Sequence, residues 1–133
     1  MLFRSKIHAA LKPGGTFLGI VPAIDAVHYY TMLLLDRALA SGKPLEAAWK
    51  NAAHMADHAD FDFARSRFAY QGLEQHFWQP FEVRYRLHRA GLRLVRLTKL
   101  HLSWKQFAGA AELKQHSAPW DWLFVARRAR SRG

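Results

Sequence analysis

The sequence contains no cysteine among its 133 residues. Disulfides, zinc–thiolate sites and thiol nucleophiles are therefore excluded. A long uninterrupted apolar run is also lacking, because the strongest one, residues 17–23, is broken by Gly19 and Pro22, whereas a membrane-spanning helix needs about 20 apolar residues. Near the N-terminus, Arg4 and Lys6 interrupt the apolar stretch that a secretory signal requires. We therefore expect a soluble cytoplasmic protein that has no membrane segment.

Acidic residues are scarce, since 10 Asp and Glu stand against 20 Lys and Arg, which gives a net charge of +10. A positive surface attracts phosphates without any sequence code. No zinc-finger, RNP or basic-zipper signature accompanies the charge. The only dense basic cluster is at the C-terminus and comprises Arg127, Arg128, Arg130 and Arg132, and such a run is typical of a solvated tail. A small basic module that binds nucleic acid stays an alternative that charge alone supports.

Apolar residues are abundant. Half of the sequence is hydrophobic, and it includes 9 Phe, 5 Trp and 4 Tyr. This composition excludes a disordered basic tail, because such tails lack the residues that build a core. The length suits one domain with a sizeable core. We expect residues 1–133 to form a single domain.

Periodicity places the elements along the chain. Residues 16–21 and 120–126 are continuous apolar runs, which are typical of strands buried on both faces of a sheet. Residues 92–104 alternate with period two apart from an irregularity at Arg96 and Leu97, which predicts a third strand. The region 65–78 is rich in aromatic residues and ambiguous. Apolar spacing and end signals predict helices over 2–11, from Asp25 to Gly42, from Pro44 to Ala52, and over 81–90.

Three segments carry a resemblance to a known family. Residues 11–17 read Leu-Lys-Pro-Gly-Gly-Thr-Phe, residues 88–92 read His-Arg-Ala-Gly-Leu, and residues 122–126 read Trp-Leu-Phe-Val-Ala. In this order and spacing they resemble the turns into strands five and six, and strand seven, of a class I S-adenosylmethionine-dependent methyltransferase. The resemblance implies an α/β fold, namely a partial Rossmann-like methyltransferase domain with a three-stranded mixed sheet in the family order 5-7-6. Residues 24–80 would be a helical insert after the first of these strands.

The motifs with which that family binds its cofactor have no counterpart in the sequence. The family uses a Gly-rich loop, whose glycines allow close backbone approach, and an acidic residue that binds the ribose. No Gly-x-Gly-x-Gly occurs, and the only Gly pair is Gly14-Gly15. The resemblance therefore implies the C-terminal half of a methyltransferase whose acceptor is an unidentified small molecule. We expect the isolated chain to be inactive and not to bind S-adenosylmethionine.

The same interpretation predicts an exposed sheet edge on the strand at 16–21, where the family has a further strand. An open apolar edge is a template for pairing. The expected partners are therefore a missing N-terminal half or a second copy of the chain. A non-catalytic protein that completes its sheet with another polypeptide stays a further alternative.

Candidate site residues follow the first strand directly. Asp25, His28, Tyr29 and Tyr30 would lie beyond its carboxyl end, where α/β sheets bind ligands. In a methyltransferase this segment would border the acceptor, with His28 as a general base, a role that histidine fills most often among the side chains. The other three would bind the substrate. An ordinary helix start, with Asp25 as the cap and Tyr29 or Tyr30 packed in the core, is the favoured interpretation, because capping and packing are the usual roles of these residue types at such a position.

A second candidate group comprises His54, Asp57 and His58, at spacing i, i+3 and i+4. Two His residues four apart on a helix can share a metal ion. The third ligand follows no recognised pattern, so a solvated polar face is favoured and no metal is predicted. The aromatic residues between 61 and 78 could form a lid over a planar acceptor or part of the core.

Overall fold

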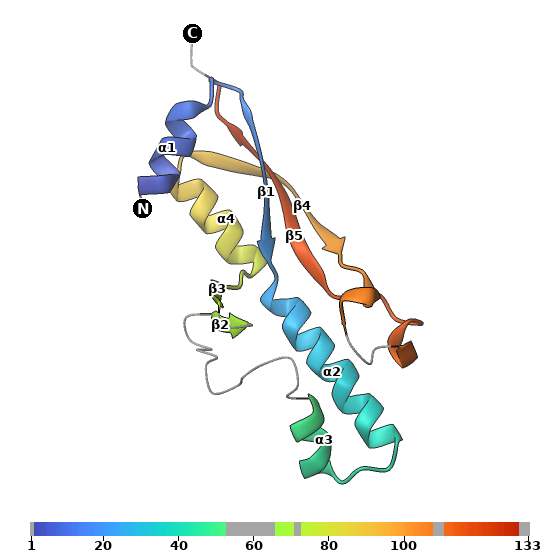
Figure 1. Cartoon of the computed structure of the whole chain (residues 1–133). Helices are drawn as coiled ribbons and strands as arrows, with labels where there is room; N and C mark the ends of the chain where they lie inside the picture. Colours follow the sequence, from blue (N-terminus) through green and yellow to red (C-terminus); the bar gives the residue numbers. More distant parts are fainter. Residues whose placement is uncertain (1, 53–65, 71–72, 108–110, 131–133) are drawn as a thin grey trace.

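The computed structural model describes residues 2–52, 66–70, 73–107 and 111–130 (Figure 1). Its central element is a three-stranded sheet of β1 (Thr16–Pro22), β5 (Trp120–Arg128) and β4 (Leu92–His101), in the order β1-β5-β4. β5 runs antiparallel to both neighbours. The expected α/β class with three strands is confirmed. The expected mixed sheet is wrong, because β5 separates the two outer strands and every strand pair in the sheet is antiparallel.

Two helices cover one face of this sheet. α1 (Leu2–Ala10) and α4 (Pro80–Arg89) lie on the same side of it (Figure 1). Val83 and Leu87 of α4 are buried in one cluster with Phe124 of β5. α4 begins where Pro80 supplies a helical φ at the first turn. It ends before Gly91, whose φ of +78° favours glycine and where a Cβ atom would stand 2.9 Å from His8 Cδ2.

α2 (Ile24–Ala40) extends beyond the end of β1, and α3 (Leu45–Ala52) lies beside it (Figure 1). The N-cap of α2 is Ala23, with no side-chain cap hydrogen bond. The expectation that Asp25 caps this helix is therefore wrong, because the helix begins earlier and Asp25 falls inside its first turn. Two short 3₁₀ helices, η3 (Trp104–Gln106) and η4 (Ala111–Leu113), follow β4.

The ambiguous region before α4 contains a hairpin. β2 (Arg67–Tyr70) and β3 (Leu73–His76) pair antiparallel. The sequence predicted a helical insert at 24–80, and the hairpin shows that this segment is not wholly helical. The chain then returns to the main sheet, where the backbone N–H of Trp78 donates to the carbonyl of Pro22 at 2.8 Å and the N–H of Ile24 donates to the carbonyl of Trp78 at 3.1 Å. These two bonds fix the start of α4 against the end of β1.

The two faces of the main sheet differ in burial. On the face beneath α1 and α4, called the packed face, Trp122, Phe124 and Ala126 are buried. On the other face Leu18 is 63% exposed and Ile20 is 57% exposed. The expectation that strands 16–21 and 120–126 are buried on both faces is therefore wrong, because no described helix packs on the second face. This open face comprises Leu18, Ile20, Leu123, Val125, Arg96 and Thr98 at its centre.

A β-bulge accounts for the irregular pattern in β4. The register shifts between Leu94 and Arg96, so Val95 opposes no residue in the described pairing. Leu94 and Leu97 both join the packed-face cluster as a result. No helix in the described part of the chain is long and apolar enough to cross a membrane.

Candidate functional site

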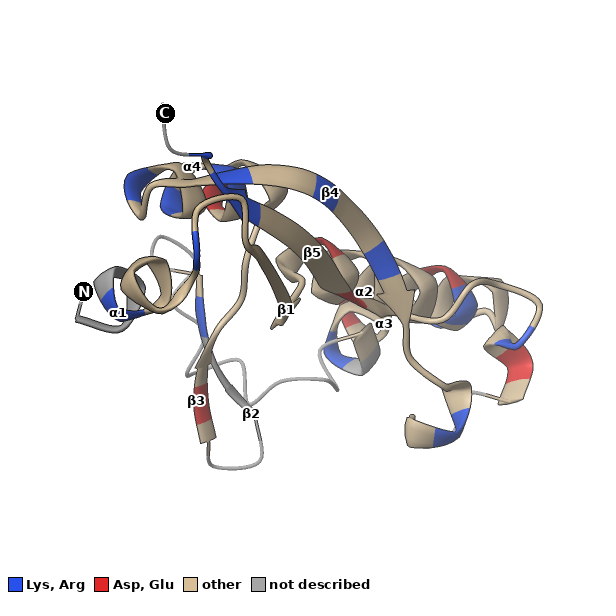
Figure 2. Ribbon diagram, turned by 90° about the horizontal axis from the view of Figure 1, so that it is seen from above, with Lys and Arg blue, Asp and Glu red and all other residues tan. Residues whose placement is uncertain are grey.

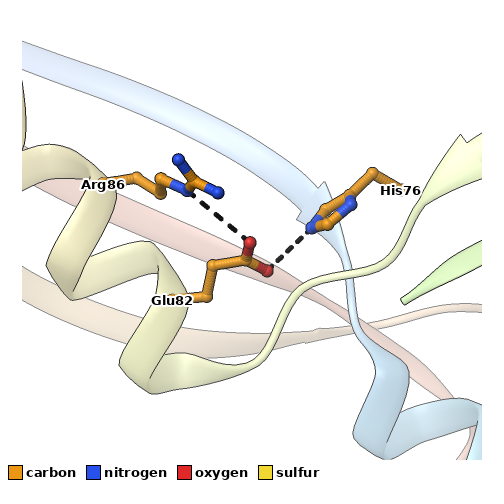
Figure 3. Close-up of polar contacts among 3 residues, drawn as sticks. All are labelled: His76, Glu82 and Arg86. Carbon is orange, nitrogen blue, oxygen red and sulfur yellow. Dashed lines mark hydrogen bonds and ion pairs between the residues drawn. The ribbon is translucent and has the colours of Figure 1, made fainter. Parts of the chain in front are cut away.

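Three side chains from two elements converge beside the start of α4. Glu82 and Arg86 are one turn apart on this helix, which places them on the same side of it. His76 comes from the end of β3, which the Trp78–Pro22 backbone pair holds close to α4. Figure 3 shows the Glu82 carboxylate between the other two side chains. His76 Nε2 lies 2.7 Å from Glu82 Oε1, and Arg86 Nε lies 3.7 Å from Glu82 Oε2.

The cluster is partly shielded from solvent. The side chain of Glu82 is 16% exposed, against 34% for His76 and 41% for Arg86. The His76 ring packs edge-on against Trp78, with 4.7 Å between ring centroids. An ionised carboxylate oxygen can only accept a hydrogen bond, so Nε2 of His76 is the donor in this short contact.

Two cavities meet at Arg86. One, called the apolar cavity, has a volume of about 490 Å³. The other has a volume of about 640 Å³ and includes all three cluster residues. Arg86 Nε is buried and makes no hydrogen bond within the described residues, and such an atom favours an acceptor. Residues lining the apolar cavity include Phe17, Gly19, Val21, Val83, Leu87 and Phe124.

The candidate residues after β1 do not gather around one cavity. Asp25 is half-buried in the first turn of α2, and His28 is exposed. Tyr29 donates its hydroxyl proton to the carbonyl of Ser117 at 2.8 Å, and its ring lies 5.3 Å from that of Trp120. Tyr30 is buried against different partners, Trp104 and Phe107. The tyrosine contacts are those of an ordinary packed helix, and the roles in acceptor binding and proton removal stay predictions.

The second candidate group falls where the structure gives no description. His54, Asp57 and His58 lie outside the described residues, as do Phe61 and Phe63. Among the residues that are described, no group of three or more His, Cys, Asp or Glu could hold a metal ion.

Positive charge gathers at one end of the open face. Arg93 lies opposite Arg127 in the register of β4 and β5, and Arg96 follows on the same side of β4. All three are exposed. Figure 2 shows Lys and Arg spaced along β4. By contrast, β1 contains no charged residue.

Sequence reasoning predicted the helix that carries Glu82 and Arg86 but missed the cluster. The spacing of four between these residues is a signal that could have been used. His76 gave no such signal, because its approach depends on a backbone pairing between Trp78 and Pro22 that no local pattern specifies. Comparison with protein families, curated proteins and solved structures found no match for this chain.

Proposed function

We propose that this chain forms the acceptor side of a class I S-adenosylmethionine-dependent methyltransferase. The observation that carries the proposal is the sheet order β1-β5-β4 with β5 antiparallel to both neighbours. The order supports the proposal because the sequence resemblance implies the order five, seven, six for these strands, although every pair in this sheet is antiparallel. A helix packed on one face, α4, precedes β4 as the resemblance also implies.

The proposed reaction transfers a methyl group from the cofactor's sulfonium to a nucleophile on a small-molecule acceptor. Such reactions depend on aligning the two reactants. Asp25 and His28 follow the carboxyl end of β1, which is where α/β sheets bind ligands. His28 would remove the proton from the nucleophile. The cofactor itself would be held by a Gly-rich segment outside this chain, since the sequence has none.

The test compares the 133-residue chain with a longer protein that includes the residues encoded upstream of Met1. The reading frame before the codon of Met1 should encode a Gly-rich loop after an apolar strand. Calorimetric titration with S-adenosylmethionine should give a saturable isotherm with the extended protein and none with the 133-residue chain. A saturable isotherm with the short chain, or an upstream frame without such a loop, would remove the proposal.

A second candidate, binding to a phosphate backbone, is favoured by the exposed cluster of Arg93, Arg96 and Arg127. Each phosphate contact steepens the logarithmic salt dependence of duplex binding by about 0.9. Replacing all three by Gln should reduce the slope by roughly three, measured by fluorescence anisotropy of a labelled duplex. A matched variant removes the same charge elsewhere, at exposed Lys43, Lys50 and Lys114. Equal reductions by both variants would show that net charge, and not this cluster, binds the duplex.

A further inference from the structure

The outer edge of β1 presents free backbone groups. Pro22 directs its carbonyl away from β5, because this carbonyl accepts from Trp78. Successive residues of a strand direct their backbone groups to opposite sides. Leu18 and Ile20 therefore direct their N–H and C=O groups to the same outer side as Pro22. Within the described residues, no backbone group outside the sheet bonds to either of them.

The outer edge of β1 lacks the features that usually prevent an edge strand from pairing with another chain. Edge strands in natural proteins carry charged residues, proline or bulges that prevent association. β1 has no charged residue, and its only proline is the terminal Pro22. Leu18 and Ile20 are also more than half exposed on the open face. The edge is therefore a suitable template for an added strand.

The apolar cavity lies beside the same strand, since Phe17, Gly19 and Val21 line it. Side chains of a strand alternate between the two faces of a sheet. A strand added to the edge would therefore direct every second side chain to the packed-face side, into this cavity. Phe124 forms its wall at Gly19, where a Cβ atom would stand 2.2 Å from the Phe124 Cζ atom.

The positive charges of this chain indicate that the partner is acidic. Arg86 lines the apolar cavity, and its buried Nε makes no hydrogen bond with any residue that the structure describes. A carboxylate on the added strand would supply the acceptor that Glu82, at 3.7 Å, does not. The net charge of +10 opposes association with a second copy and favours an acidic partner.

We propose that the outer edge of β1 binds an extended segment of an acidic polypeptide as an added strand. Apolar side chains of this segment enter the apolar cavity, and one of its carboxylates pairs with Arg86. The proposal does not rest on methyl transfer, because it uses no residue assigned to the acceptor or the cofactor. It concerns the 133-residue chain, since the methyltransferase resemblance would place a further strand of the longer protein at this same edge.

The first test uses the full chain and short capped peptides, about seven residues long, the length of a typical strand. The peptides alternate valine and threonine and carry one glutamate, which is moved through every position so that no register is assumed. At about 1 mM, at least one peptide should slow amide hydrogen exchange of Leu18 and Ile20 by about tenfold. Unchanged exchange of these two amides with every peptide would overturn the proposal.

A second measurement tests whether a carboxylate of the bound peptide pairs with Arg86. Replacing the glutamate by glutamine in the best peptide, or making Arg86→Gln in the chain, should weaken binding by about tenfold, and the two changes together should weaken it no further. Arg89→Gln is the matched control, because Arg89 is exposed on the same helix, and it should leave the affinity unchanged. Equal binding of the two peptides to the unmodified chain would overturn the assignment of Arg86.

A third variant blocks the edge itself. Ile20→Pro removes an N–H that points outward, so pairing with β5 is retained. It should abolish peptide binding while the far-ultraviolet circular dichroism stays unchanged, and Leu18→Pro should do the same. Exchange of Leu18 and Ile20 that slows with increasing concentration of the chain alone would assign the edge to a second copy and overturn the proposal. The cofactor titration is unaffected by any of these outcomes.

Discussion

The packed and open faces of the sheet are built from the same three strands, yet they differ sharply in burial. Trp122 and Phe124 are 7% and 6% exposed, whereas Leu18 and Ile20 are 63% and 57% exposed. Apolar content alone therefore does not decide burial, which requires another element to lie against the strand. Because hydrophobic stabilisation scales with the area removed from water, at about 25 cal/mol per Å², the packed face contributes more to the stability than the open face does. The open face is left available for binding.

The largest expected effect is on the free energy of unfolding, and it should differ between substitutions at two neighbouring residues of β5. Phe124→Ala should lower the free energy of unfolding by about 3–5 kcal/mol, because it leaves a cavity in the packed-face cluster. Leu123→Ala, on the open face, should lower it by about 1 kcal/mol or less. Urea denaturation of both variants measures the difference. Comparable losses would contradict the distinction between the faces.

The contact between Gly19 and Phe124 should give the next largest effect. Gly19→Ala places a Cβ atom 2.2 Å from the Phe124 Cζ atom, so the ring must move. We expect a loss of about 1–3 kcal/mol, as for other overpacked cores. The loss should be largely absent when Gly19→Ala is made in a Phe124→Leu background, and a double-mutant cycle by urea denaturation measures this coupling. Additive losses would show that the close approach is not the cause.

The polar cluster beside the packed face should contribute less. Glu82→Gln removes the charged acceptor of His76 and the counter-ion of Arg86, and we expect a loss of about 1 kcal/mol. The matched control is Glu74→Gln, because Glu74 pairs with Arg67 at 3.1 Å while both side chains are more than half exposed. The control should cost less than about 0.5 kcal/mol in the same denaturation experiment. An equal loss from both variants would show that shielding does not strengthen the cluster.

The smallest expected effect concerns Asp121, on the open face. Burial raises the pKa of this carboxyl above its ordinary 3.8. The folded state therefore binds a proton more readily than the unfolded state, and the charged form costs stability above the folded pKa. Asp121→Asn should thus be more stable than the parent at pH 7, by less than about 0.5 kcal/mol. The gain should disappear as the pH falls below 3.8, measured by denaturation at both pH values; a gain independent of pH would exclude this cause.

The elements that sequence predicted correctly depend on local signals. α4 has an apolar stripe, a proline at its first turn and a glycine just beyond its end, and all three features can be recognised in sequence. The alternation in β4 was also recognisable. The hairpin of β2 and β3 was not, because strands of four residues are too short to establish a period.

The features that were missed depend on contacts between distant segments. A continuous apolar run in β1 predicted burial on both faces, but no local pattern states whether a helix will cover each face. The site is a similar case. Glu82 and Arg86 were placed on a helix correctly, whereas His76 joins them only because Trp78 pairs with Pro22. The position of the three side chains is therefore a product of the tertiary fold.

The bulge in β4 has a consequence for variation in chain length. Val95 is the residue that opposes no partner in the described pairing of β4 with β5, and pairing resumes at Arg96. If Val95 were deleted, Leu94 and Arg96 would become adjacent in a regular ladder, and every later residue of the strand would keep its present orientation. A deletion at any other interior position of β4 would transfer its following side chains to the opposite surface. Position 95 is therefore where this strand can lose one residue while its other side chains keep facing the same side of the sheet.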